Sequence, residues 1–369
     1  MKNFVIISTY PAAGSRNIGD QLITTCLKQV ILDNFPEAKF DIIWRADTWN
    51  NVRETVLSAD HVFFACLAMR PHMHKKEYPF LKDLLDTGIP FSVVAAGTDL
   101  PVSRDLNIYE GFSEESLLLL KKANDDAVVF TTRGCISHEF CRRNGLDRAI
   151  FNGDVAFYDK ALDDLAFHKD LDVRKIIISD PHRAAIYIES LEVLVDGLEL
   201  VFPEAEIYLA QHGVNRVVED FCERRSLRIE RIYEDRHSGL NVYDEADLHV
   251  GFRVHGHVSA LKRRKYSYLL EQDGRGCDYG ATILSKISIP NYSATGSHKV
   301  SVKNLIKRLI GRPVSFKQKA SISPAYQILA LIKRDADCGF GKFVGLEKQI
   351  SDFNRLTEES IKRVLSNAK

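Results

Sequence analysis

The chain has 369 residues, of which 45% are hydrophobic and 27% are charged, which is typical of a soluble globular protein. This length predicts roughly two domains. Lys plus Arg and Asp plus Glu each number 50, so no overall positive field favours a nucleic-acid partner. The longest apolar runs, such as residues 62–69, are far too short to span a bilayer.

The first eight residues predict a strand and lack the longer apolar core of a signal peptide. The seven cysteines are scattered along the chain, odd in number and without a CxxC pair. This pattern predicts neither a disulfide framework nor a zinc site. We therefore expect a protein of the reducing cytoplasm.

Strand-like and helix-like segments alternate through the first half of the chain. Strands are predicted at residues 4–8, 40–44, 61–67, 91–96, 128–132 and 149–152, and helices at 20–34, 114–123 and 137–144. This alternation is typical of a parallel sheet with helices on its faces. It predicts a first Rossmann-like domain over residues 1–160.

Residues 159–172 are charged and strand-free, and they predict a linker. The alternation then resumes, with strands near 175–179, 206–210, 228–232, 248–252 and 266–270 and helices at 184–202 and 217–225. A second Rossmann-like domain is expected over residues 173–300. Strands are expected to stop after Pro290. Helices at 302–310, 325–333 and 346–365 would form an extension over 301–369, either docked on the first domain or paired between subunits.

Doubly wound domains bind ligands at the carboxyl ends of their strands, so the loops that leave strands are the places to look for a site. The most informative loop is Gly251-Phe-Arg253-Val-His255. Arg253 and His255 are two residues apart and would leave a strand end on the same side. They would face the same space as the amide groups that begin the next helix. A fixed cation, an imidazole and amide donors together suit an anionic substrate that needs proton transfer.

The loop after the first predicted strand contains Asn17, Gly19 and Asp20. Glycine permits close backbone approach, and a helix N-terminus attracts an anion. Asn17 or Asp20 can equally be no more than a cap of the helix. Both interpretations remain open at this stage.

Further polar side chains follow other predicted strands. Arg133 follows residues 128–132, Asp154 follows 149–152 and Arg275 follows 266–270. Together with Arg253, these arginines predict a cleft, shared by both domains, that receives several negative charges. His212 and residues 180–183 are weaker candidates for contact with substrate.

The basic run Lys-Arg-Arg-Lys at residues 262–265 ends the predicted helix after His255. We expect it to be a solvated helix end that complements the helix dipole. The alternative is contact with an anionic membrane surface or with a lipid-linked diphosphate.

Taken in order, these motifs resemble the polysaccharide pyruvyl transferase family over roughly residues 1–290. The matching residues are Asn17-x-Gly19-Asp20, Arg133-x-x-x-Ser137 with the later Gly145, Asp154-x-Ala-Phe157 and Gly251-Phe-Arg253-Val-His255-x-x-x-Ser-Ala260. The resemblance implies an α/β fold in which two doubly wound domains take a GT-B-like arrangement. It also implies transfer of a pyruvyl group from phosphoenolpyruvate onto two hydroxyls of a sugar, giving a cyclic ketal. Arg133, Arg253 and His255 would then surround the donor.

Phosphoenolpyruvate carries a carboxylate and a phosphate on a small carbon frame, and bidentate arginines match both groups. His255 is the best candidate for moving protons, as acid or as base. Phosphoenolpyruvate would be the donor substrate, and no metal or other cofactor is expected. The saccharide acceptor would be free or attached to a lipid or a nucleotide. The enzyme would work in the cytoplasm or at the inner face of the membrane, alone or as a homo-oligomer.

Two other functions fit the same sequence. A GT-B glycosyltransferase that uses a nucleotide-sugar shares the fold and a need for Arg and His near phosphates, and fold does not fix function. A catalytically inactive carbohydrate-binding relative is the other alternative.

Overall fold

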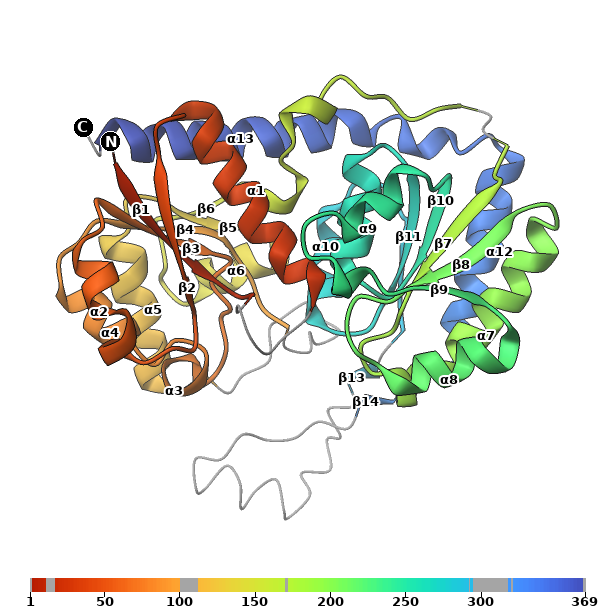
Figure 1. Cartoon of the computed structure of the whole chain (residues 1–369), viewed down its shortest axis with the longest axis horizontal. Coiled ribbons are helices and arrows are strands. Elements are labelled where there is room, and N and C mark those ends of the chain that lie inside the picture. The colour runs from red at the N-terminus through yellow and green to blue at the C-terminus, as the bar shows by residue number, and fades with distance from the viewer. Residues whose placement is uncertain are drawn as a thin grey trace, which may run out of the picture.

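The computed structural model describes residues 2–10, 17–99, 112–169, 172–291, 293–294, 318–319 and 321–367. Two six-stranded parallel sheets with flanking helices lie side by side and are joined by the segment that follows Phe157 and by the C-terminal helices (Figure 1). The predicted helix at 302–310 and residues 11–16 of the first loop lie outside the described residues.

The first sheet has the order β2-β1-β3-β4-β5-β6, and all its pairs are parallel. Its strands are β1 (Asn3–Ser8), β2 (Lys39–Trp44), β3 (His61–Ala65), β4 (Phe91–Ala96), β5 (Phe130–Thr132) and β6 (Ala149–Phe151). The helices are α1 (Ile18–Asn34), α2 (Trp49–Leu57), α3 (Met73–Lys76), α4 (Leu81–Asp86), α5 (Glu114–Asp126) and α6 (Cys135–Arg143), followed by the 3₁₀ turns η1 (Val155–Phe157) and η2 (Lys160–Leu162).

Burial of the central strands explains why they could be recognised in the sequence. Every residue of β3 and β4 is buried, because helices cover both faces of the sheet, and such strands appear as continuous apolar runs. The edge strand β2 is mostly exposed and carries Lys39 and Asp41, charges of the kind that discourage pairing with another edge.

The second sheet has the order β12-β11-β10-β7-β8-β9 and is also parallel throughout. Its strands are β7 (Lys175–Ser179), β8 (Glu206–Ala210), β9 (Arg228–Glu230), β10 (Leu248–Gly251), β11 (Tyr266–Glu271) and β12 (Ser288–Pro290). The helices are α7 (Ala184–Val201), α8 (Arg216–Arg225), α9 (Val254–Lys262) and α10 (Gly274–Thr282), with 3₁₀ turns η3 (Ile232–Glu234) and η4 (Gly239–Asp244).

Some elements in the second half of the chain differ from the sequence-based expectation. The strand β12 and the helix α10 occupy a stretch for which no element was predicted. Strands also do not stop after Pro290, because β13 (Ser293–Ala294) pairs antiparallel with β14 (Gln318–Lys319). A strand of two or three residues is too short to show a period, and three glycines in α10 hide its helical pattern.

The order of strands reverses between β1 and β3 in the first sheet and between β7 and β10 in the second. Ligands of doubly wound folds bind outside the carboxyl ends of strands at such a reversal. Asn17 follows β1 and Arg253 follows β10, so the two strongest sequence motifs lie at these two points.

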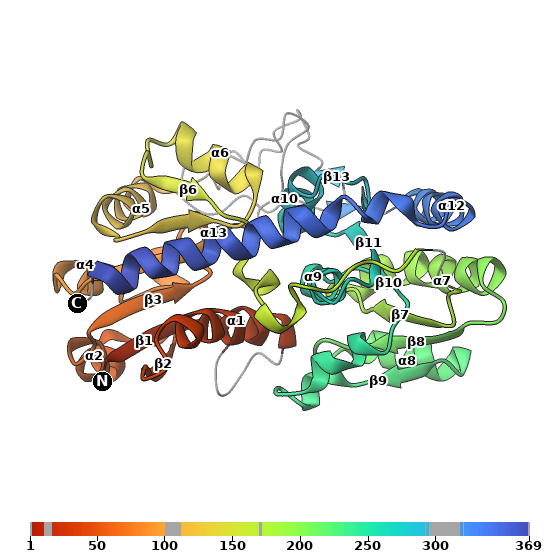
Figure 2. The same cartoon turned by 90° about the horizontal axis from the view of Figure 1, so that it is seen from above.

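The C-terminal helices are α12 (Ser323–Asp337) and α13 (Leu346–Asn367), with the 3₁₀ turn η5 (Gly341–Phe343) between them. The helix α12 packs on α7 and β11, and α13 runs back across the molecule to the first sheet (Figures 1 and 2). Asn152 donates hydrogen bonds to Leu356 O at 3.0 Å and to Ser360 Oγ at 2.7 Å on α13. The extension therefore docks on the first unit of its own chain, which was one of the two expected uses.

The two units also contact each other directly through α10 and α6. The buried carboxylate of Asp278 on α10 accepts hydrogen bonds from Ile136 N at 2.9 Å and from Ser137 Oγ at 2.5 Å. Thr282 Oγ1 accepts from Cys135 N at 2.9 Å. The amides at the start of α6, which have no partner within the helix, are thus capped by side chains of the other unit, and this couples the two sheets.

The basic run at 262–265 was wrongly expected to be a solvated helix end. Lys262 and Arg264 are each only 4% exposed. Lys262 Nζ donates to Tyr158 O at 3.2 Å and lies 3.2 Å from Asp159 Oδ2, while Arg264 Nε donates to Leu165 O at 3.1 Å. The run faces the segment that joins the two units, which a pattern of charges alone does not reveal. Among the described residues, no helix is both long enough and apolar enough to cross a membrane.

A buried carboxyl group lies at the end of β11. Glu271 is 2% exposed, and its Oε1 accepts a hydrogen bond from Ser288 Oγ at 2.7 Å. Within the described residues its Oε2 has no hydrogen-bond partner. Burial raises the pKa of Glu271 to about 7, although Ser288 and Lys286 oppose the shift.

We expect Glu271→Gln to make the protein harder to unfold at pH 8 than the wild type. An acid whose pKa is raised on folding contributes stability below pH 4.5 that is lost as pH rises through 7. The variant lacks this loss, so its free energy of unfolding should exceed that of the wild type by up to about 3 kcal/mol at pH 8 and match it near pH 4.5. Urea unfolding at the two pH values measures the difference.

Glu245→Gln is the control, because Glu245 is exposed and its pKa is lowered by the hydrogen bond and charge of Lys175. Its effect should be small and opposite in direction. An equal difference between Glu271→Gln and the wild type at both pH values would contradict the assignment.

Candidate functional site

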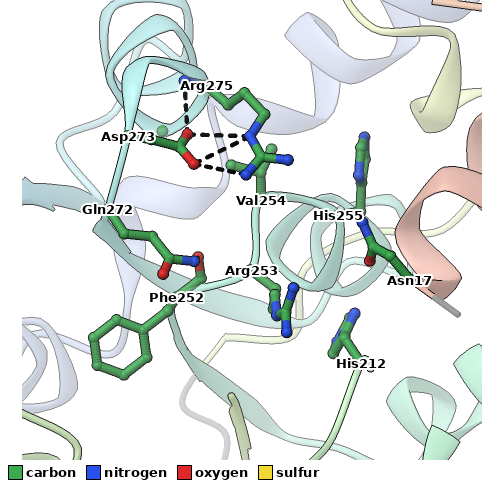
Figure 3. Close-up of a pocket in the computed structure, with 10 residues that line it drawn as sticks. Asn17, His212, Phe252, Arg253, Val254, His255, Gln272, Asp273 and Arg275 are labelled. Atoms are coloured by element: carbon green, nitrogen blue, oxygen red, sulfur yellow. Dashed lines mark hydrogen bonds and ion pairs between the residues drawn. The ribbon is translucent and has the colours of Figure 1, made fainter. Parts of the chain in front are cut away.

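A pocket lies where the two units meet at the carboxyl ends of their sheets (Figure 3). The first unit contributes the start of α1, and the second contributes the loops after β8, β10 and β11. The lining residues are Asn17, His212, Phe252, Arg253, Val254, His255, Gln272, Asp273, Arg275 and Gly276. Nine site residues were predicted from the sequence. Five of them line this pocket, namely Asn17, His212, Arg253, His255 and Arg275, whereas Gly19, Asp20, Arg133 and Asp154 do not.

Arg253 is not a free cation. Its Nε donates to Asp180 Oδ1 at 2.9 Å and its Nη2 donates to Asp180 Oδ2 at 2.6 Å. Asp180 is fully buried and the Arg253 side chain is 10% exposed. A buried guanidinium needs such a partner. From the sequence, residues 180–183 were only weaker candidates for contact with substrate. The remaining nitrogen, Nη1, lies 3.4 Å from His182 Nδ1.

Arg275 is held in the same manner. Asp273 caps α10 by accepting from Arg275 N at 3.0 Å, and it also accepts from Arg275 Nη2 at 2.6 Å (Figure 3). Burial alone would raise the pKa of Asp273, but the charge and hydrogen bonds of Arg275 lower it. The pocket therefore contains two arginines whose forks are each fixed by a carboxylate on one edge.

His255, in the first turn of α9, faces the first unit. A Cβ on Gly19 would lie only 2.8 Å from both Cβ and Nδ1 of His255, so the imidazole packs directly against the start of α1. On its other side, His255 Nε2 is 3.8 Å from Asp154 Oδ2. This contact explains why a glycine stands at position 19.

Asp154 comes from the loop after β6 and is buried at the boundary between the units. It accepts from Ala156 N at 2.8 Å and from the hydroxyl of Tyr279 on α10. Burial by itself would raise the pKa of Asp154, but His255, Arg133 and Tyr279 together lower it. Asp154 is therefore held as a carboxylate beside His255.

His212 follows β8 and is fully buried. Its Nε2 lies 2.7 Å from the hydroxyl of Tyr243, and its backbone N donates to Asp180 Oδ1 at 2.9 Å. Burial is the main cause that lowers the pKa of His212 far below its usual range, with a further contribution from the charge of Arg253. Its ring is neutral, and it lies beside Arg253 in the pocket (Figure 3).

The start of α1 combines the two roles considered for it. Asn17 Oδ1 caps the helix by accepting from Gly19 N at 3.3 Å, and Asn17 also lines the pocket. Asp20 lies in the first turn and is half-buried, outside the lining, where its charge contributes to raising the pKa of Arg275. The main cause of that shift is Asp273.

Arg133 does not line the pocket. Its side chain turns back over the first sheet, where Nη2 donates to Thr98 O at 2.9 Å and Nη1 lies 3.7 Å from Cys66 Sγ. The guanidinium also packs against Gly97, where a side chain would have no room. Its positive charge interacts electrostatically with the carboxylates of Asp154 and Asp278 at the boundary between the units. Arg133 thus acts on the pocket through Asp154, whereas Arg253 and Arg275 face it.

Several site residues were not predicted from the sequence. Tyr279 is four residues after Arg275 and would have been found on the same helical face if α10 had been recognised. Tyr243, within η4, gives no signal in the sequence because its contact with His212 is made only in the folded chain. No group of three or more His, Cys, Asp or Glu side chains arranged to hold a metal ion occurs in the described part of the chain.

Comparison with solved structures finds proteins of similar architecture. UDP-N-acetylglucosamine 2-epimerase from Rickettsia bellii matches with a TM-score of 0.50 and 12% identity, over 100% of this chain and 97% of that chain. The Neisseria meningitidis UDP-GlcNAc 2-epimerase bound to UDP-GlcNAc has a TM-score of 0.46 and 11% identity over 90% of this chain and 99% of that one. The wall teichoic acid polymerase TagF has a TM-score of 0.47 and 11% identity over 98% and 89%. At these identities the similarity concerns the fold alone, which is GT-B-like.

No curated protein matches the chain by sequence. The sequence profile of the polysaccharide pyruvyl transferases matches residues 17–272, which is well over half of the chain and extends from Asn17 to Gln272 of the pocket. The chain therefore belongs to the polysaccharide pyruvyl transferase family, a family of transferases.

Proposed function

We propose that this protein transfers the pyruvyl group of phosphoenolpyruvate to two hydroxyls of a saccharide, forming a cyclic ketal in the synthesis of a cell-surface or exported polysaccharide. The observation that carries the proposal is the joint placement of Arg253, Arg275 and His255 around one pocket, in a chain of this family. The acceptor is proposed to enter from the first unit, whose α1 borders the same pocket.

The pocket suits a small donor with two anionic groups. Arg253 and Arg275 each hold an aspartate through Nε and Nη2, which fixes the direction of the guanidinium. Arg253 Nη1 lies 3.4 Å from His182 Nδ1, and because Nη1 carries two protons it retains one for the donor. The amides in the first turn of α9 have no partner within the helix and attract an anion. A carboxylate and a phosphate on one small frame would use both kinds of donor.

The proposed reaction needs a proton to arrive at the methylene carbon of phosphoenolpyruvate. One sugar hydroxyl then bonds to C2, the C2–O bond to phosphate breaks, and a second hydroxyl bonds to C2 to close the ketal. Of the two hydroxyl protons, one balances the proton given to carbon and the other leaves with phosphate. His255 is the group proposed to move these protons.

Asp154 supports that role. Its carboxylate lies 3.8 Å from His255 Nε2 and is fixed by Ala156 N and by the hydroxyl of Tyr279. A negative charge in this place stabilises the imidazolium that forms when His255 takes a proton. Tyr279 and Asp154 are therefore proposed to orient His255 across the boundary between the units.

Donor binding should depend on the fork of Arg253. Arg253→Ala would leave Asp180 as an unpaired buried charge and could unfold the protein, so Arg253→Lys is the cleaner variant. It keeps the positive charge but loses the bidentate geometry, and we expect calorimetry to show phosphoenolpyruvate binding weakened on the order of 10- to 100-fold.

Arg142→Lys is the control, because Arg142 makes a similar fork to Glu139 on the exposed surface of α6. It should bind the donor like the wild type. A parallel titration with uridine diphosphate separates the two transferase classes. Binding of uridine diphosphate without phosphoenolpyruvate would reject the proposal in favour of a nucleotide-sugar donor.

His255→Ala should abolish turnover and leave donor binding largely intact, since the two arginines and the α9 amides remain in place. The measurements are phosphate release and calorimetric affinity for phosphoenolpyruvate. Turnover at the wild-type rate would remove His255 from the mechanism.

Gly19→Ala tests the contact between the units at the pocket. The added methyl group would lie 2.8 Å from His255, so the ring must move, and kcat should fall on the order of 100-fold. The thermal midpoint should not fall in parallel, because alanine is a better helix former than glycine by about 1 kcal/mol.

Gly213→Ala is the matched control, since a Cβ there meets nothing within 4 Å although His212 is its neighbour. This variant should keep the wild-type rate. Equal rates for the two variants would show that the packing of His255 against α1 has no part in turnover.

A further inference from the structure

Four buried side chains of the second unit form a continuous chain of hydrogen bonds under the pocket. Ser179 Oγ at the end of β7 lies 2.9 Å from His249 Nε2 on β10, and His249 Nδ1 lies 2.7 Å from Ser267 Oγ on β11. Ser267 Oγ in turn lies 2.6 Å from His257 Nδ1 on α9. We call these four residues the Ser–His chain. None of them is more than 1% exposed, and none lines the pocket.

The Ser–His chain ends at the turn that carries Arg253. Ser179 Oγ accepts hydrogen bonds from Phe252 N and from Arg253 N, both at 3.1 Å, and Phe252 N also donates to Ser179 O at 3.3 Å. Gly251, just before this turn, leaves the necessary space, because a Cβ there would meet Ser179 Oγ and would lie 2.6 Å from Ser179 N and from Ser179 O. One hydroxyl thus holds two consecutive amides of the loop between β10 and α9.

These two amides fix the direction of every bond in the Ser–His chain. A serine hydroxyl has two acceptor positions and one proton. Both acceptor positions of Ser179 are used by amides, so its proton must be donated to His249 Nε2. His249 then carries its proton on Nδ1 and donates to Ser267, and Ser267 must donate to His257 Nδ1. The alternation of donors and acceptors leaves one arrangement that satisfies all four groups.

Both imidazoles are neutral, as this arrangement requires. Burial lowers the pKa of His249 far below its usual range and that of His257 to about 3. A protonated His249 would point a second N–H at Ser179 and leave the serine proton without an acceptor. Both rings therefore stay neutral at pH 7.

We propose that Ser179 and His249 are positioning residues of the transferase site: the directed Ser–His chain holds the turn at Phe252 and Arg253 in one conformation. This inference rests on the proposed function only where donor binding is concerned. Asp180 fixes the guanidinium of Arg253, while the preceding residue of the same strand end, Ser179, fixes its backbone. Because α9 begins directly after that turn, the orientation of the turn sets the positions of the α9 amides and of His255.

The hydrogen-bond direction can be tested without any substrate. Nitrogen NMR of protein labelled on its 12 histidines reports which ring nitrogen carries the proton. We expect the proton of His249 on Nδ1 and that of His257 on Nε2. The proton of His249 on Nε2, or a charged His249 at pH 7, would overturn the inference.

Two serine variants give an asymmetric prediction. Ser179→Ala removes the group that dictates the tautomer of His249, so its proton should redistribute between the two nitrogens. Ser267→Ala leaves Ser179 and both amides in place, so the proton of His249 should stay on Nδ1. The same response to both substitutions would show that the amides do not set the direction.

The effect on the site is measured against a matched control in the other sheet. His61 Nε2 and Ser92 Oγ form a similar buried pair at 2.9 Å, on β3 and β4, and neither residue lines the pocket. Ser179→Ala should shift the NMR signals of the His255 ring and weaken phosphoenolpyruvate binding on the order of 10- to 100-fold. Ser92→Ala, which also loses a buried hydrogen bond, should change neither quantity.

The two proposals fail in different ways. An unchanged His255 signal and unchanged donor affinity in Ser179→Ala would overturn the positioning role and leave the pyruvyl transfer proposal standing. If the wild-type protein binds no phosphoenolpyruvate, the proposed donor is wrong, and the histidine signals still decide whether Ser179 positions the turn.

Discussion

The buried ion pair between Arg253 and Asp180 is the interaction on which the geometry of the site depends. Asp180 leaves β7 at the point where the strand order reverses, and it binds both Nε and Nη2 of Arg253 and the backbone N of His212. Removing one partner of such a pair costs about 3–5 kcal/mol, because the other charge stays buried. The fold and the orientation of Arg253 are therefore established together.

The proposed anionic donor would meet charges that are already paired. Arg275 is held by Asp273, and His255 faces Asp154, so no side chain there is an unrestrained cation. Donors that are fixed before the substrate arrives do not have to reorganise during the reaction, which makes them more effective than mobile charges. The aspartates thus fix the direction of the arginine donors, but they also cancel the positive charge of those arginines.

The proposed role of His255 depends on both units. The first unit supplies Gly19, against which His255 packs, and Asp154, which faces the same imidazole. The second unit also contacts the first through Asp278, which caps α6. In addition, α13 packs against the first unit at Asn152. A shift of either unit would separate His255 from its carboxylate, so the contacts far from the pocket maintain the site.

Much of this architecture was predictable from the sequence, because strands buried on both faces leave continuous apolar runs. Predicted boundaries for β4, β7 and β8 agree with the structure, and the motif at Arg253 and His255 lies where a strand-end motif should. Asp180 and Tyr279 could not be assigned as partners, because ion pairs and hydrogen bonds between distant segments leave no local pattern. The buried Lys262 and the direction taken by Arg133 were missed for the same reason: a sequence shows charges but not the neighbours that bury them.

We propose that His255 moves protons while the pyruvyl group passes from phosphoenolpyruvate to a saccharide in this pocket. The most direct measurement is phosphorus NMR of the protein incubated with phosphoenolpyruvate, with and without a pool of saccharide acceptors. We expect orthophosphate release that requires an acceptor, together with a new methyl signal of the ketal in the proton spectrum. Phosphoenolpyruvate that stays intact with every acceptor, while a nucleotide-sugar is consumed in its place, would contradict it.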